Sequence, residues 1–130
     1  MSSYGFSVAL KSTMAQAIAQ VTDALKSEGF GILTEINIRD TLKAKLGVDT
    51  RPHVILGACN PQLAHQALTA EPDISLLLPC NVVVREEADG SVLVSFMDPV
   101  AVLKLTDNTT IAEIAQGVRK KLEQVRDKLK

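Results

Sequence analysis

The sequence predicts an α+β fold: one curved, mostly antiparallel sheet with two long helices packed on one face. Two long stretches, 13–27 and 109–129, place apolar residues three or four positions apart, as in amphipathic helices. Ala88-Asp89-Gly90 is a typical hairpin turn between two strands. The remaining helical stretches, 40–46 and 61–70, are short. Together with the hairpin, they favour an α+β layer over the repeated crossovers of an all-parallel sheet.

Five stretches are predicted as strands because their apolar residues alternate or run without interruption: 4–10, 30–38, 52–59, 75–86 and 91–97. Pro79 interrupts the fourth stretch. Because proline cannot donate a hydrogen bond to a neighbouring strand, we expect a bend, a bulge or a sheet edge there.

The helices are predicted to begin at residues that cap helix N-termini. Ser12 or Thr13 precedes the first helix, and Thr109 or Thr110 precedes the last. Asn60 followed by Pro61 is a strong start for the helix that runs to about residue 70, because proline at the first helical position loses no hydrogen bond.

Length and composition exclude several classes of protein. The 130 residues fit a single domain over 1–130, and a net charge of −1 leaves no basic excess to neutralise nucleic-acid phosphates. Aromatic residues make up only 3%, which leaves few rings on which bases could stack. We see no stretch for membrane insertion and no export signal, so we expect a cytoplasmic protein with reduced cysteines.

Charge is unevenly distributed along the chain. Residues 71–113 hold eight acidic and two basic residues, whereas residues 114–130 hold six basic and two acidic ones. One interpretation is that these charges complement the dipole of the last helix. The other is that an acidic patch on one protomer meets the basic helix end of a second, which predicts a homodimer.

Two matching phrases carry the clearest chemical signal, Ala58-Cys59-Asn60-Pro61 and Pro79-Cys80-Asn81-Val82. Cys59 directly precedes a predicted helix N-terminus, where free N–H groups would lower the pKa of a thiol and favour a reactive thiolate. The alternative is that both cysteines are small buried hydrophobic residues. Cys59 and Cys80, completed by His65 or by a partner protomer, could also bind a soft metal such as Cu(I) or Zn. We expect the two cysteines to lie on neighbouring strands, which would run parallel if they pair directly through the crossover helix over 61–70.

These phrases also carry a family resemblance. Gly31-Ile-Leu-Thr-Glu35-Ile, the cysteine phrases and Asp98-Pro99 occur in an order that resembles the domain of unknown function 302 family. The resemblance implies a compact α+β domain, similar to the TATA-binding-protein-like group and often dimeric. It implies no established activity.

The sequence favours a non-enzymatic module that binds a small ligand or a partner, because it contains no phosphate loop, nucleophile elbow, zinc-protease helix or thioredoxin motif. The candidate ligand-binding residues are Cys59, Asn60, Cys80, Asn81 and Glu35. The alternatives are a thiol redox or sulfur-carrier protein that uses Cys59 with Cys80, and a soft-metal binding protein. No cofactor is implied.

The predicted homodimer has a direct test. Sedimentation equilibrium at tens of micromolar protein should give twice the 14.0 kDa mass of the chain. A monomer mass at that concentration would contradict the prediction.

Overall fold

The computed structural model describes residues 2–130 and contains one five-stranded sheet in the order β1-β5-β4-β3-β2. The bounds of the strands are β1 Gly5–Leu10, β2 Gly31–Asn37, β3 His53–Cys59, β4 Cys80–Glu86 and β5 Val92–Met97. Every neighbouring pair is antiparallel. The predicted α+β fold with an antiparallel sheet is therefore confirmed.

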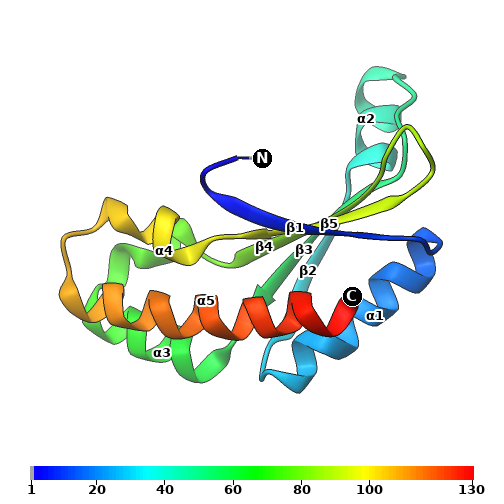
Figure 1. Ribbon diagram of the computed structural model, residues 1–130. Coiled ribbons are helices and arrows are strands. Elements are labelled where there is room, and N and C mark those ends of the chain that lie inside the picture. Colours follow the sequence, from blue (N-terminus) through cyan, green and yellow to red (C-terminus); the bar gives the residue numbers. More distant parts are fainter. Residues whose placement is uncertain (1) are drawn as a thin grey trace.

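The main helices lie on one face of this sheet (Figure 1). Three of them, α1, α3 and α5, form that layer, in which α5 packs against both α1 and α3, whereas α2 projects from one end of the sheet. The bounds of the helices are α1 Met14–Ser27, α2 Ile38–Leu46, α3 Pro61–Ala70, α4 Pro99–Val102 and α5 Thr109–Leu129, and those of the 3₁₀ turns are η1 Pro72–Leu77 and η2 Leu103–Leu105.

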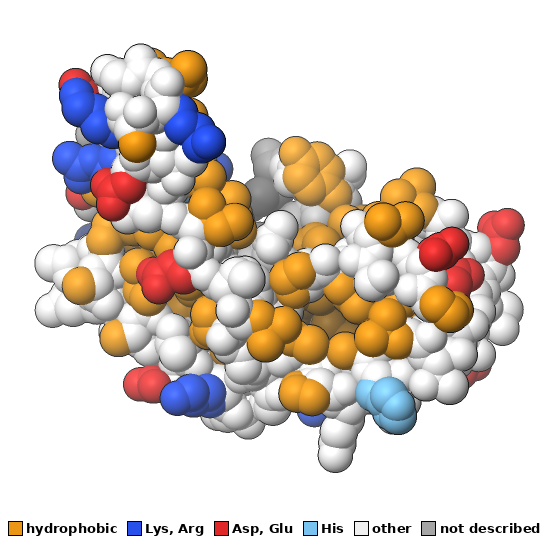
Figure 2. Space-filling model, turned by 180° about the vertical axis from the view of Figure 1, so that it is seen from behind, with side chains coloured by type: hydrophobic (Ala, Val, Ile, Leu, Met, Phe, Trp, Pro, Cys, Tyr) orange, Lys and Arg blue, Asp and Glu red, His pale blue; other side chains and the backbone are white. Residues whose placement is uncertain are grey.

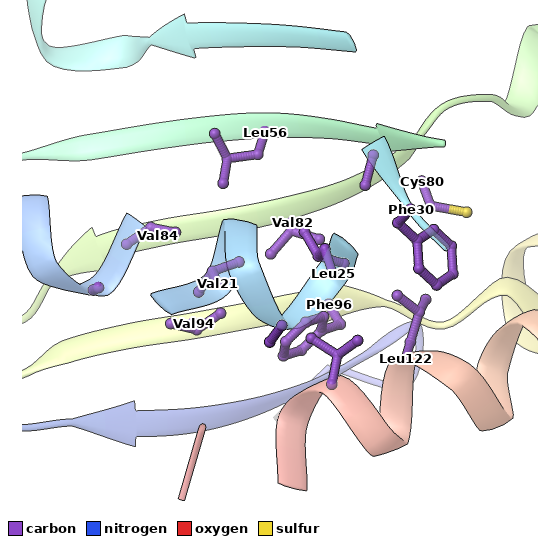
Figure 3. Close-up of a cluster of buried hydrophobic side chains, with 14 of the residues drawn as sticks. Val21, Leu25, Phe30, Leu56, Cys80, Val82, Val84, Val94, Phe96 and Leu122 are labelled. Atoms are coloured by element: carbon purple, nitrogen blue, oxygen red, sulfur yellow. The ribbon is translucent and has the colours of Figure 1, made fainter. Parts of the chain in front are cut away.

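Side-chain alternation along the strands places the core between the sheet and this helix layer. Val82, Val84, Val94 and Phe96 each point toward the helices and are at most 1% exposed. Figure 3 shows Val21 and Leu25 of α1 and Leu122 of α5 packed against them, with Cys80 beside Phe30 at one end of the cluster. Burial of this apolar area is the main source of stability.

Local capping chemistry explains where the helices begin. Thr13 and Gln16 form a capping box, in which each side chain accepts the other's backbone N–H. The prediction of Thr13 as a cap is thus confirmed. Asn108, rather than a threonine, caps α5, because its Oδ1 accepts from the backbone N–H groups of Thr110 and Ile111.

The main departures from the predicted boundaries lie before Cys80 and after Asn37. The expected strand over 75–86 begins only at Cys80, because Pro72–Leu77 form the 3₁₀ turn η1. The Leu78–Pro79 peptide bond between them is cis. The expected strand over 30–38 ends one residue early, because the side chain of Asn37 accepts from the N–H of Asp40 and starts α2. Both corrections arise from local turn chemistry, which apolar periodicity does not detect.

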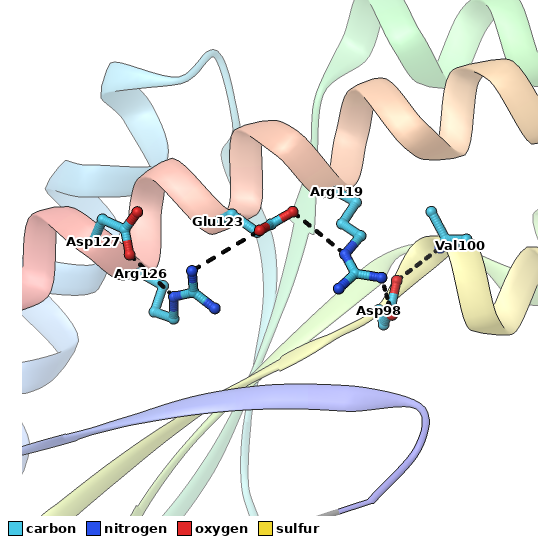
Figure 4. A network of polar contacts seen from close by, with 6 residues as sticks. All are labelled: Asp98, Val100, Arg119, Glu123, Arg126 and Asp127. Atoms are coloured by element: carbon cyan, nitrogen blue, oxygen red, sulfur yellow. Dashed lines mark hydrogen bonds and ion pairs between the residues drawn. The ribbon is translucent and has the colours of Figure 1, made fainter.

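The buried carboxylate of Asp98 fixes the start of α4 and ties it to α5. Its Oδ1 accepts from the N–H of Val100 at 2.9 Å, and its Oδ2 accepts from Arg119 at 2.9 Å. Arg119 also pairs with Glu123, one turn further along α5 (Figure 4). Asp98 is only 7% exposed. The ion pair between Asp98 and Arg119 therefore holds the end of β5 and the α4 turn against α5.

The edge strand β2 is irregular and largely exposed. Its register with β3 shifts between Ile32 and Thr34, so Leu33 is an extra residue and is 65% exposed. Glu35 lies opposite Leu56 on this strand and is solvent-exposed.

Gly57 lies in the middle of the sheet where two neighbours approach closely. A Cβ atom at this position would overlap the Thr34 hydroxyl and would lie 3.0 Å from Cγ of Pro79. The absence of a side chain thus lets Pro79 fold over β3 and lets the chain enter β4 directly at Cys80.

We predict that Gly57→Ala destabilises the protein by about 1–3 kcal/mol, because the added methyl group overpacks this contact. The measurement is urea denaturation followed by circular dichroism. Gly31→Ala is the matched control, since a Cβ at Gly31 meets no atom within 4 Å. Equal stability losses in the two variants would contradict the steric explanation.

Candidate apolar binding pocket

An apolar pocket lies where β3 ends, β4 begins, and α3 and α5 pass beneath the sheet. Its cavity volume is about 40 Å³, and its mouth opens to the surface. Figure 2 shows hydrophobic side chains gathered around a hollow on this side of the molecule. The walls come from six segments of the chain: Phe30, Ala58, Cys59, Asn60, Leu63, Ala64, Ala67, Leu78, Pro79, Cys80, Pro99, Leu103, Ile114 and Val118.

Both cysteines line this pocket. Ala58 and Cys80 are directly paired on β3 and β4, which puts both of these side chains on the helix-covered face of the sheet. Cys59 is the last residue of β3, and its backbone pairs with Gly31 of β2. The prediction that the cysteines lie on neighbouring strands is confirmed, but the expected parallel pairing is wrong, because η1 and the turn at Pro79 return the chain antiparallel.

The thiols are held in their neutral form. Burial raises the pKa of Cys59, and burial together with the nearby Cys59 raises the pKa of Cys80 to about 11. The pKa of Cys59 is therefore not lowered, as expected for a thiol beside the α3 N-terminus, but raised, because burial disfavours the thiolate. Both cysteines are free thiols.

The amide of Asn60 is already engaged by the fold. Its Oδ1 accepts from the N–H of Leu63 at 3.2 Å and so caps α3 as predicted. Its Nδ2 donates to the carbonyl oxygen of Glu28 at 3.5 Å, next to Gly29, whose φ of +86° ends α1. Asn60 thus joins the end of α1 to the start of α3 at the rim of the pocket.

The other candidate residues lie elsewhere. Asn81 points to the opposite, solvent-exposed face of the sheet, across from Gly57. Glu35 lies on the exposed β2 edge, and His65 lies on the exposed side of α3. Within residues 2–130, no three His, Cys, Asp or Glu side chains gather closely enough to hold a metal ion.

Sequence reasoning missed most of the apolar walls. Leu103, Ile114 and Val118 come from η2 and α5, far along the chain from the cysteine phrases. Ile114 and Val118 belong to the apolar stripe of the last predicted helix, but periodicity cannot show which part of a core is incompletely filled.

The family model described as "Domain of unknown function DUF302" matches residues 6–129. The chain belongs to this family. A solved structure described as "Crystal structure of uncharacterized conserved protein DUF302 from Bacillus stearothermophilus" is similar to it, with 29% sequence identity and a TM-score of 0.91. The similarity covers 99% of this chain and 100% of that one. No curated protein matches the chain.

Membership of the DUF302 family confirms the resemblance seen in the sequence and assigns no activity. Within the part of the chain that the structure describes, no helix is long and apolar enough to cross a membrane.

We predict that the thiols of this DUF302 protein react slowly at neutral pH. With a pKa of about 11, Cys80 is about one part in ten thousand thiolate at pH 7, and its reaction rate should rise about tenfold per pH unit up to that pKa. Iodoacetamide labelling followed by mass spectrometry measures each site.

Cys59, which is less buried, should react faster than Cys80. Cys59→Ser and Cys80→Ser assign the two rates, and the urea-unfolded protein gives the reference rate. A thiol that reacts in the folded protein as fast as in the unfolded one would contradict the prediction.

Proposed function

We propose that the protein is a non-enzymatic binding module that holds a small apolar group in the pocket between its two cysteine phrases. The observation that carries this proposal is the composition of the walls: aliphatic, aromatic and neutral thiol side chains converge there from β3, β4, α3 and α5. Such concave apolar sites with few polar groups are the usual form of small-molecule sites.

The size of the cavity limits the ligand class. A cavity needs roughly 10–15 Å³ in this measure to hold one water molecule, so a volume of about 40 Å³ admits a group of a few atoms. Sites for drug-sized ligands are about 300–1,000 Å³. The ligand that fits is therefore a short alkyl group, alone or as the tip of a larger molecule that extends out of the mouth.

The walls supply no group suited to proton transfer. No Asp, Glu, His, Lys or Arg is among the described residues that line the pocket, and both thiols are protonated at neutral pH. General acid–base catalysis needs a group whose pKa lies near the working pH. This composition supports binding in preference to catalysis.

Thiol redox chemistry and soft-metal binding are the alternative functions, and they use the same two cysteines. The placement of Cys59 and Cys80 at one pocket favours them, whereas the raised pKa of each thiol opposes them. Native mass spectrometry of protein purified without chelator distinguishes these functions from apolar binding, because a bound metal or sulfur adduct changes the mass.

The apolar pocket can be tested with xenon and 1-butanol as probes. In ¹H–¹⁵N NMR spectra, both probes should shift the amide signals of pocket residues such as Leu63, Ala67 and Ile114. Ala64→Leu should abolish these shifts, because the larger side chain fills the space beside α3.

Ala112→Leu is the matched control, since Ala112 is exposed on α5 and does not line the pocket. If Ala64→Leu fails to fold, Leu63→Ala provides the opposite test, because the enlarged cavity should bind 1-hexanol more tightly than the wild type does. Shifts spread evenly over the surface, or unchanged by either pocket variant, would overturn the proposal.

A further inference from the structure

A second, wider cleft lies at the other end of β3, away from the cysteines. It is formed by the start of α2, the segment that joins α2 to β3, and the end of β4. Its volume is about 740 Å³, and it is broad and open to solvent, so a small molecule could lie along it with one side exposed. Two of the segments that line the cleft are joined by a backbone hydrogen bond, in which the N–H of Glu86 donates to the carbonyl oxygen of Pro52 at 3.0 Å.

Three arginines line this cleft, although the whole chain has a net charge of −1. Arg39 comes from α2, Arg51 from the joining segment and Arg85 from β4. The guanidinium groups of Arg39 and Arg51 make no ion pair within residues 2–130, whereas Arg85 uses its Nε to contact Glu87 at 2.9 Å. Figure 2 shows Lys and Arg side chains gathered around the projecting α2 end of the molecule.

Two acidic residues also line the cleft and oppose this charge. Asp49 is paired with Lys43 at 3.0 Å, so its charge is locally balanced. Glu86 makes no ion pair in the described part of the chain. The two unpaired arginines therefore face one unpaired carboxylate, which leaves the cleft positive.

Two uncharged groups add hydrogen-bonding capacity. His53 is paired across the sheet with Arg85, and its pKa is lowered by partial burial and by the charge of Arg85. Thr50 also lines the cleft, and its buried hydroxyl has no hydrogen-bond partner. A buried hydroxyl without a partner is unfavourable. Rotation of Thr50 toward a bound acceptor would satisfy it.

We propose that this cleft binds a small molecule that carries a doubly charged oxyanion, namely a phosphate ester. A phosphate group offers three acceptor oxygens and a charge of about −1.5 to −2 at neutral pH. Arginine presents several N–H donors in a planar fork that matches such oxygens in pairs. The converging groups are Arg39, Arg51, Arg85, His53 and Thr50, and the volume leaves room for the organic part of the ester.

The two histidines of the chain allow a sharp test by ¹H NMR. Glycerol 3-phosphate, and sulfate as an anion of constant charge, should raise the pKa of His53, because a nearby dianion stabilises the imidazolium form. His65 is exposed on α3, does not line the cleft, and serves as the internal control. Chloride at the same ionic strength is the control for general screening.

Variants then identify the groups responsible. Arg39→Gln and Arg51→Gln should each weaken sulfate and glycerol 3-phosphate binding by about tenfold, the usual effect of one charge-assisted hydrogen bond. Lys45→Gln removes the same charge from α2 without altering the lining of the cleft, and should change the Kd less than twofold. Glu86→Gln should tighten binding.

Three results would overturn the proposal. The first is an equal shift of His53 in chloride, which would show screening alone. The second is an equal loss of affinity in Lys45→Gln and Arg51→Gln, which would show general attraction to α2. The third is sulfate binding without glycerol 3-phosphate binding, which would exclude a phosphate ester as the ligand.

Discussion

One apolar face of the antiparallel sheet has to be covered, and most of the structure follows from that requirement. Val82, Val84, Val92, Val94 and Phe96 are together nearly inaccessible to solvent beneath α1 and α5. Where β3 ends and β4 begins, the helix-covered side of the sheet is closed by α3, by the short segments around Leu78 and Leu103, and by the N-terminal half of α5. The apolar pocket lies at this junction, where residues from six segments meet without filling the space completely.

The features of the fold that follow from periodicity were predictable from the sequence. The long helices, the hairpin at Gly90 and the caps at Thr13 and Asn60 all lie where residue patterns place them. The η1 turn before Cys80 was not predictable, because Ser75–Leu78 have the composition of a buried strand. Their conformation follows from Pro72, which begins the 3₁₀ turn, and from the close approach of Pro79 to Gly57.

The candidate site was predictable only in part. The repeated Cys-Asn phrase marked two neighbouring strands correctly, yet strand alternation separates Asn81 from Cys80 by turning it to the other face. The protonation of the thiols depends on how much solvent the folded chain removes, and no local pattern encodes that quantity. The arginine cleft was not predictable either. Arg39, Arg51 and Arg85 lie on separate segments of the chain, and they line one cleft only after β3 pairs with β4.

The irregular edge strand β2 has a consequence for the behaviour of the protein at high concentration. A straight, apolar edge strand offers unpaired backbone groups to which another chain can add, and this leads to aggregation. The extra residue Leu33 breaks the register, Glu35 places a charge in the middle of the strand, and α2 begins directly after Asn37. These features shorten the stretch of edge open to strand addition, so β2 can remain exposed without recruiting further chains into an extended sheet.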